Sequence, residues 1–124
     1  MQGLGRHVLA EVYGCEFRIL NDLDRIREIL VSAALTAGAE VRETAFHRFS
    51  PQGVSGVVVI SESHLAIHTW PELGYAAVDV FTCGERVDPW VALDSIAKDF
   101  GSTNVTAQEM KRGVFLRSSE AAGS

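Results

Sequence analysis

The chain has 124 residues, 47% of them hydrophobic and 22% charged, which is the size and composition of a single globular domain, 1–124. Its net charge of −5 argues against a broad nucleic-acid-binding surface, and its longest apolar run is too short to cross a membrane. Two cysteines are too few for a secreted disulfide framework, and no charged-then-apolar leader opens the sequence, so we expect a cytoplasmic protein with free thiols.

The first half of the chain predicts a strand, a helix and a second strand. Side chains alternate along Gly3–Tyr13, although neither face of this strand is purely apolar. Asn21 is a favourable N-cap for a helix over Asp22–Ala37, in which apolar residues recur with helical spacing until Gly38 stops it. The second strand follows over Glu40–Phe49.

The second half consists mostly of short strands. Continuous valines in Gly56–Ser61 predict a third strand that is buried on both faces. Alternation over 64–70 predicts a fourth strand, and Pro71–Gly74 turns the chain after it. The remaining elements are a fifth strand over Tyr75–Thr82, a helix capped by Asp88 with Pro89 at its first position and Gly101 at its end, a sixth strand over Asn104–Met110, a short seventh strand over Val114–Leu116, and a disordered tail over 117–124.

This order of elements defines the expected fold class. A strand, a helix, a cluster of strands, a second helix and a final strand suggest an α+β protein, a two-layer sandwich in which a mostly antiparallel sheet carries two helices on one face. The other face of the sheet then needs a cover, because a domain of this length buries a limited part of its own surface. A second copy of the chain is the simplest cover, so we expect a dimer that forms through this face.

Reactive side chains gather around the fourth strand. On a helix, His64 and His68 would share one face and could bind zinc. On a strand they are about 13 Å apart, which is too far for two ligands of one ion. We therefore expect no metal ion in the site.

The nucleophiles permit two interpretations each. Ser63 lacks the flanking glycines of a nucleophile elbow, and by itself it is an ordinary turn serine. Cys83 and His68 could be a thiol nucleophile and its base, or a small buried residue at a strand end and a core histidine. By themselves, the other candidates are two core aromatic residues and a solvated turn carboxylate: Phe49, Trp70 and Glu72.

Taken together, these residues resemble a known family. The run GVSGVVVISESHLAIHTWPELGYAAVDVFTCG closely resembles the bacterial S-adenosylmethionine decarboxylases, which are small pyruvoyl-dependent proenzymes of spermidine synthesis. The stretches LGRHVLAEVYGC and AFHRFSPQGVSG resemble the same family, and the resemblance covers about residues 3 to 90. A serine between Glu62 and His64, in register with His68 and Trp70-Pro71-Glu72, is a highly specific signature.

The resemblance implies self-cleavage of the chain between Glu62 and Ser63. The products would be a β chain, 1–62, and an α chain, 63–124, which begins with a pyruvoyl group made from Ser63. It also implies that His68 is the base for this processing and that the Ser55 hydroxyl helps to hold the intermediate. The pyruvoyl group would be a covalent cofactor that accepts electrons during decarboxylation.

The resemblance further implies the substrate, S-adenosyl-L-methionine, bound as a Schiff base with the pyruvoyl group. Cys83 would return a proton to its α-carbon, Phe49 and Trp70 would hold the adenine, and Glu72 would bind the ribose hydroxyls. The site would lie between the two protomers of an (αβ)2 dimer. Two alternatives remain: an enzyme of the same fold that acts on ornithine or arginine, and a non-catalytic binding subunit.

Overall fold

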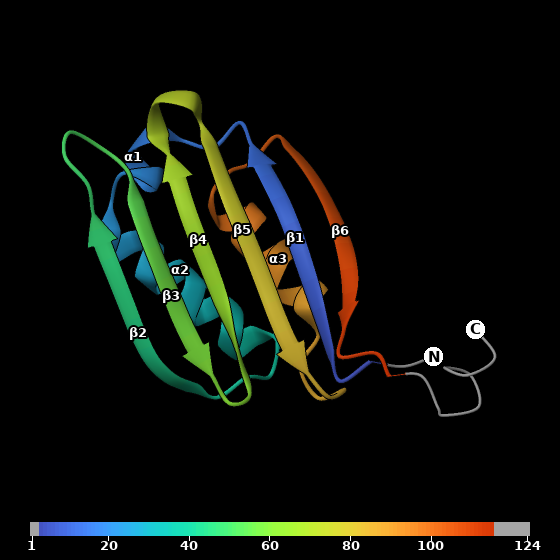
Figure 1. The fold of residues 1–124 in the computed structure, drawn as a ribbon. Coiled ribbons are helices and arrows are strands. Elements are labelled where there is room, and N and C mark those ends of the chain that lie inside the picture. The colour runs from blue at the N-terminus through green and yellow to red at the C-terminus, as the bar shows by residue number, and fades with distance from the viewer. Residues whose placement is uncertain (1–2, 116–124) are drawn as a thin grey trace.

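The computed structural model describes residues 3–115 and has two layers, a six-stranded sheet and a layer of helices on one of its faces (Figure 1). The strand order is β2-β3-β4-β5-β1-β6, and each neighbouring pair is antiparallel. The expected α+β sandwich is confirmed. The elements are β1 Gly5–Tyr13, α1 Phe17–Leu20, α2 Leu23–Thr36, β2 Val41–Arg48, β3 Val54–Ile60, β4 Ser63–Trp70, the 3-10 helix η1 Pro71–Leu73, β5 Tyr75–Cys83, α3 Pro89–Asp99 and β6 Asn104–Arg112.

The hydrophobic core lies between the sheet and the two long helices. Strand side chains alternate between the two faces of a sheet, so every second residue of the central strands points toward the helices. These residues are buried against the apolar stripes of α2 and α3, and burial of this area supplies most of the stabilisation. The largest side chains of this core include Val8, Val12, Leu65 and Ile67 from the sheet, Ile26, Ile29 and Leu30 from α2, and Leu93 and Ile96 from α3.

The other face of the sheet is open in the single chain. Val58 of β3 is buried under the helices, whereas its neighbour Val59 points to the open face and is 38% exposed. The prediction that this strand is buried on both faces is therefore wrong for one chain. Leu9, Tyr13 and Met110 are also exposed on the open face. Leu9 and Tyr13 alternate along β1 with buried residues, and Met110 pairs with His7 of the same β1 face. The dimer that would cover these side chains stays a prediction.

The start of α2 differs from the sequence prediction by one residue. Asp22 is the N-cap, because its side chain accepts a hydrogen bond from the backbone N–H of Arg25 at 3.1 Å. Asn21 instead accepts a hydrogen bond from the backbone N–H of Gly53, also at 3.1 Å, and so ties the helix to the β2–β3 loop. Both residue types cap helices well, and the tertiary contact decides between them.

Several boundaries also differ. The first strand begins at Gly5 rather than Gly3, and the short helix α1 was not predicted. Val114 and Phe115 lie outside any strand, so the predicted seventh strand is absent from them, while Leu116 and the predicted tail at 117–124 lie outside the described residues. Of the helices within residues 3–115, none has the length and apolar character needed to cross a membrane.

Candidate active site

The Glu62–Ser63 bond lies in the tight turn between β3 and β4. Ile60 pairs with Ser63, so Ser61 and Glu62 form a two-residue connection. Glu62 has a φ of 78°, and among the described residues it is the one non-glycine residue with positive φ. A side chain disfavours this conformation, at a cost of about 1 kcal/mol or more, so the turn holds backbone strain next to this bond.

Contacts from the start of β2 hold this turn. The Arg42 Nε–H donates to the Ser61 hydroxyl at 2.9 Å, and that hydroxyl donates to a Glu40 carboxylate oxygen at 3.3 Å. The Ser61 backbone N–H also donates to the Glu40 carbonyl oxygen at 3.0 Å. These bonds fix Ser61 and oppose relaxation of the strained residue that follows it.

Cys83, at the end of β5, reaches the same turn. Its thiol donates to the Glu62 carbonyl oxygen at 3.2 Å, and its Sγ lies 3.5 Å from the Ser63 Oγ. Cys83 is partly exposed, so the interpretation of it as a fully buried residue does not hold. Cys15 is the buried cysteine, and burial raises the pKa of its thiol to about 11, which keeps it protonated at neutral pH.

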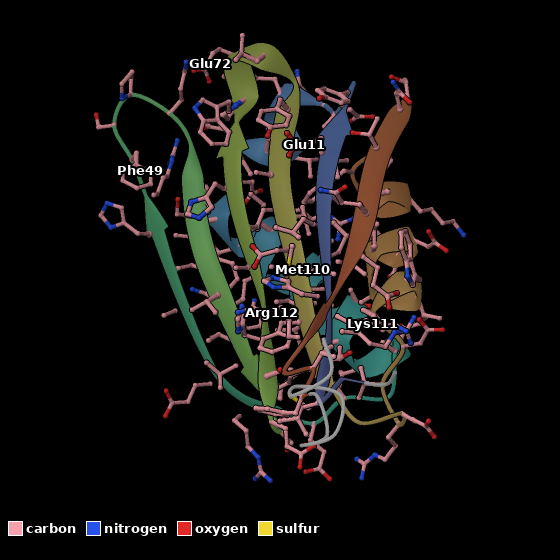
Figure 2. The ribbon with its side chains drawn as sticks, turned by 45° about the vertical axis from the view of Figure 1, so that its right-hand side comes forward. Glu11, Phe49, Glu72, Met110, Lys111 and Arg112 are labelled. Carbon is pink, nitrogen blue, oxygen red and sulfur yellow. The ribbon has the colours of Figure 1, made fainter. Side chains whose placement is uncertain are left out.

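A second group of candidate residues lies at the opposite end of the sheet. The Ser55 Oγ and the His68 Nδ1 face each other across β3 and β4 at 2.7 Å. His68 is exposed, so it is not a core histidine. Phe49, Trp70 and Glu72 join these two residues around a cavity of about 310 Å³, and Figure 2 shows Phe49 and Glu72 at this end of the molecule.

Aromatic stacking holds Trp70 in place. Its ring stacks on Tyr75 at 5.2 Å between ring centroids, and Tyr75 stacks in turn on Tyr13 at 5.4 Å. The Tyr75 hydroxyl donates to a Glu11 carboxylate oxygen at 2.9 Å. Burial together with this carboxylate raises the pKa of Tyr75 to about 12, so the hydroxyl stays a donor. Trp70 is 40% exposed and is not a core residue, and it offers its remaining surface to the cavity.

The two groups do not meet within one chain. Ser63 begins β4 and His68 lies five residues further along it, a separation of about 17 Å at ~3.3 Å per residue. Pairing across the β3–β4 hairpin places Ser55 opposite His68 and Ile60 opposite Ser63, at the two ends of the same ladder. Of the two proton-handling residues that the resemblance implies, Cys83 therefore lies beside Ser63 of its own chain and His68 does not.

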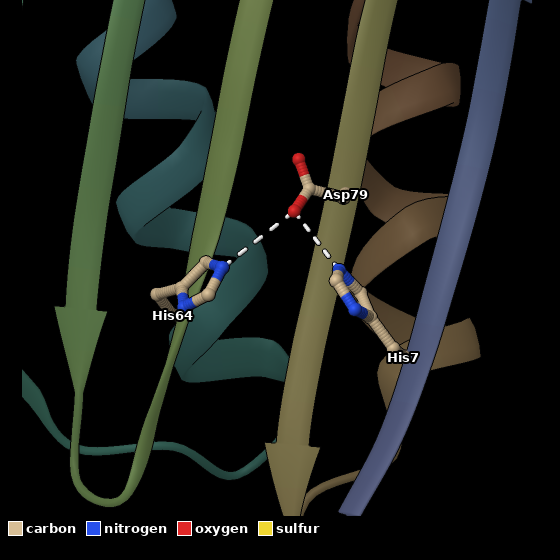
Figure 3. A group of neighbouring side chains, drawn as sticks. All are labelled: His7, His64 and Asp79. Atoms are coloured by element: carbon tan, nitrogen blue, oxygen red, sulfur yellow. Dashed lines mark hydrogen bonds and ion pairs between the residues drawn. The ribbon is translucent and has the colours of Figure 1, made fainter. Parts of the chain in front are cut away.

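The structure also brings together residues that the sequence did not connect. His7 of β1, His64 of β4 and Asp79 of β5 meet on the open face of the sheet (Figure 3). The His7 Nε2 lies 3.0 Å from an Asp79 carboxylate oxygen, and the His64 Nε2 lies 3.5 Å from the same oxygen. Alternation along each strand indicates on which side of that strand a residue lies. It does not indicate that β1 pairs with β5, which is the pairing that brings His7 close to Asp79.

Comparisons with known proteins identify the family of this chain. Residues 6–113 match the sequence profile of a family described as S-adenosylmethionine decarboxylase. The S-adenosylmethionine decarboxylase proenzyme of Carboxydothermus hydrogenoformans is 71% identical over 116 residues, which are 94% of this chain and 91% of that protein. The corresponding proenzyme of Moorella thermoacetica is 71% identical over 114 residues, which are 92% of this chain and 91% of that protein.

A solved structure has the same fold. The adenosylmethionine decarboxylase of Aquifex aeolicus superposes with a TM-score of 0.87 at 34% sequence identity, over 94% of this chain and 96% of that one. The fold and the matched residues thus define a class of small decarboxylase proenzymes. The chain belongs to the S-adenosylmethionine decarboxylase family, and the resemblance found in its sequence is confirmed.

Proposed function

We propose that this protein cuts its own chain between Glu62 and Ser63 and then decarboxylates S-adenosyl-L-methionine to the aminopropyl donor for spermidine synthesis. The observation that carries the proposal is the strained Glu62 backbone beside Ser63, with the Cys83 thiol on the Glu62 carbonyl oxygen, in a member of this family. Its two unpaired thiols, Cys15 and Cys83, fit an enzyme of the cytoplasm.

Processing begins as an N-to-O acyl shift. The Ser63 Oγ attacks the Glu62 carbonyl carbon, the C–N bond breaks, and the released Ser63 amine takes the hydroxyl proton. The Cys83 thiol donates toward the Glu62 carbonyl oxygen, which gains negative charge in the transition state. A base then removes the Ser63 α-proton, and elimination releases the Glu62 carboxylate and leaves dehydroalanine. Water converts this residue to a pyruvoyl group and ammonia.

The base is His68 of a second copy of the chain. Within one chain His68 lies about 17 Å from Ser63 along β4, so this histidine cannot reach the Ser63 of its own chain. A copy laid on the open face in the opposite orientation would place its Ser55 and His68 over Ser63. The exposed apolar side chains of that face, such as Val59 and Leu9, support such a dimer.

The cavity that Phe49, Trp70 and Glu72 line suits a nucleoside with a positive charge. Aromatic faces attract a sulfonium cation and stack on adenine, and a carboxylate accepts hydrogen bonds from both ribose hydroxyls. The pyruvoyl group supplies a carbonyl that accepts electrons as carbon dioxide leaves. Cys83 then supplies the proton to the substrate α-carbon. Ornithine and arginine lack the adenosine group that this cavity suits.

The first prediction is cleavage at a single bond. Purified protein should give two fragments in denaturing mass spectrometry, 1–62 and 63–124, and the second should carry a ketone in place of its amine. The Ser63→Ala chain should stay intact and inactive, because the attacking oxygen is gone. A chain that stays uncut and is still active would contradict the proposal.

The second prediction concerns substrate choice. Release of carbon dioxide from S-adenosylmethionine should be far faster than release from ornithine or arginine, because only the first offers an adenosine group to Phe49, Trp70 and Glu72. Release of labelled carbon dioxide measures all three rates. The reverse order would favour the alternative substrates, and a processed chain that decarboxylates none of them would favour a binding subunit.

A further inference from the structure

Two imidazoles and a carboxylate converge on the open face outside the residues used for processing and substrate binding. They come from the three neighbouring strands β1, β5 and β4 (Figure 3). His7 and His64 are the two register partners of Phe81, one on each side of it. Asp79 is two residues before Phe81 and points to the same face, so the hydrogen-bonded ladder itself fixes the spacing of the three side chains.

The spacing of the ligand atoms fits a small divalent ion. Tetrahedral coordination with bonds of about 2.0–2.2 Å separates ligand atoms by about 3.3–3.6 Å. The two histidine Nε2 atoms lie 3.0 Å and 3.5 Å from one Asp79 oxygen, and the three ligand atoms lie within 4.8 Å of one another. An ion could therefore be bound with small side-chain rotations and without a change in the sheet.

The rings are already oriented. His7 stacks on Phe81 with 5.0 Å between centroids and 23° between planes, and His64 meets the edge of the same ring at 5.7 Å and 78°. Rings fixed in this way lose little freedom when an ion binds, which favours affinity.

Arg112 competes with an ion for His7. Its Nη1 lies 2.9 Å from the His7 Nδ1, and because arginine can only donate, this nitrogen must accept. The ring proton is then on Nε2, where it is donated to Asp79. Ligation through Nε2 requires that this proton moves to Nδ1 and that the Arg112 guanidinium withdraws. Arg112 is exposed and lies at the end of β6, so its side chain has room to withdraw.

We propose that His7, His64 and Asp79 form a binding site for one transition-metal ion of the Zn²⁺ type per chain. Two neutral imidazoles with one carboxylate suit Zn²⁺, Co²⁺ or Ni²⁺, whereas Mg²⁺ and Ca²⁺ prefer oxygen ligands. The assignment of this site does not rest on the function proposed above. His64 also lines the groove of about 580 Å³ beside Ser63, so a bound ion would sit in the wall of that groove.

The test uses tag-free, processed protein that has been stripped with a chelator. Calorimetric titration with Zn²⁺ should give one site per chain, and Mg²⁺ should give none. His7→Ala, His64→Ala and Asp79→Asn should each weaken Zn²⁺ binding by at least about tenfold, because each removes one ligand. His47→Ala is the matched control, since this exposed histidine lies on β2, away from the cluster. The affinity of this variant for Zn²⁺ should stay at the parent value. Circular dichroism without metal checks that each variant is folded.

Two further measurements address the ligand set. Arg112→Ala should bind Zn²⁺ more tightly than the parent, because it removes the competing donor. The Co²⁺-loaded protein should show ligand-field bands without a thiolate-to-cobalt charge-transfer band, since neither cysteine belongs to the cluster. The assignment would be overturned by absence of saturable binding, by Zn²⁺ affinity at the parent value in the three ligand variants, by no gain in affinity for Arg112→Ala, or by a thiolate-to-cobalt band.

Discussion

Glu62 has a backbone conformation that few residues with a Cβ adopt, and it lies directly before the proposed nucleophile. Asparagine or glycine would occupy this position with less strain. The strain at Glu62 raises the free energy of the uncut chain, and the proposed cleavage after this residue would relieve it. The hydrogen bonds between Ser61 and Glu40 hold this turn in its strained conformation.

His68 and Cys83 lie at different ends of the sheet, and we expect their variants to fail at different steps. His68→Ala should stall the chain at or before the ester, because no base removes the Ser63 α-proton. Hydroxylamine cleaves esters, so it should cut any ester that has accumulated, and mass spectrometry after this treatment would detect the products.

Cys83→Ala should still process, more slowly, because it loses only the weak thiol donor on the Glu62 carbonyl oxygen. Its turnover should fall by about 10²–10⁴-fold, the usual contribution of a general acid. Protonation at the wrong carbon should also convert part of the cofactor to alanine by transamination, which the mass of the 63–124 fragment would reveal. Turnover within about threefold of the parent would remove Cys83 from the mechanism.

The strands show how far the sequence alone could predict the site. Alternation along Leu65, Ile67 and Thr69 identified β4 and placed His68 on the opposite face. The turn residues Pro71–Gly74 located its C-terminal end, whereas Ser63, which by itself is interpreted as a turn residue, is its first residue. What a single sequence could not provide is the partner of each strand: β1 pairs with β5 and β6, which lie more than sixty residues away. The cluster of His7, His64 and Asp79 depends on that non-local pairing, and so it was not predicted.

The cap of α2 provides a direct test of a local prediction that was wrong. Asp22→Ala should destabilise the chain by about 1 kcal/mol, because the Arg25 N–H loses its acceptor, whereas Asp22→Asn should stay close to the parent. Urea unfolding in a Ser63→Ala background, where the chain stays uncut, measures both. Asp24→Ala is the control within the same helical turn and should cost only a few tenths of a kcal/mol. Equal effects of Asp22→Ala and Asp24→Ala would refute the cap.

In the whole molecule, helices cover one face of the sheet and the other face is open in the single chain. The proposed function requires that a second copy covers the open face and completes the site. Co-expression of a Ser63→Ala chain with a His68→Ala chain tests this directly. Each chain alone should be inactive. In a mixed dimer, the Ser63→Ala chain supplies His68 to the intact Ser63 of its partner, so one site is complete. With statistical mixing, about a quarter of the parent activity should return.

Mass spectrometry should then find cleavage in the His68→Ala chain alone, since the other chain has no attacking oxygen. Native mass spectrometry confirms that the mixed dimers have formed. Mixed dimers without cleavage, or a His68→Ala chain that cleaves by itself at the parent rate, would place the base elsewhere.

The strand order has one more consequence, which concerns the reversibility of folding. In the sheet, β1 lies between β5 and β6, so a strand from residues 1–62 is hydrogen-bonded on both edges by strands from residues 63–124. Before the cut, these pairings form within one molecule. If the chain is cut between Glu62 and Ser63 as proposed, the two fragments must find each other in solution before β1 can pair with β5 and β6. Refolding of the cut protein is then a second-order reaction whose rate depends on protein concentration, so we expect the uncut chain to refold when very dilute and the cut protein not to.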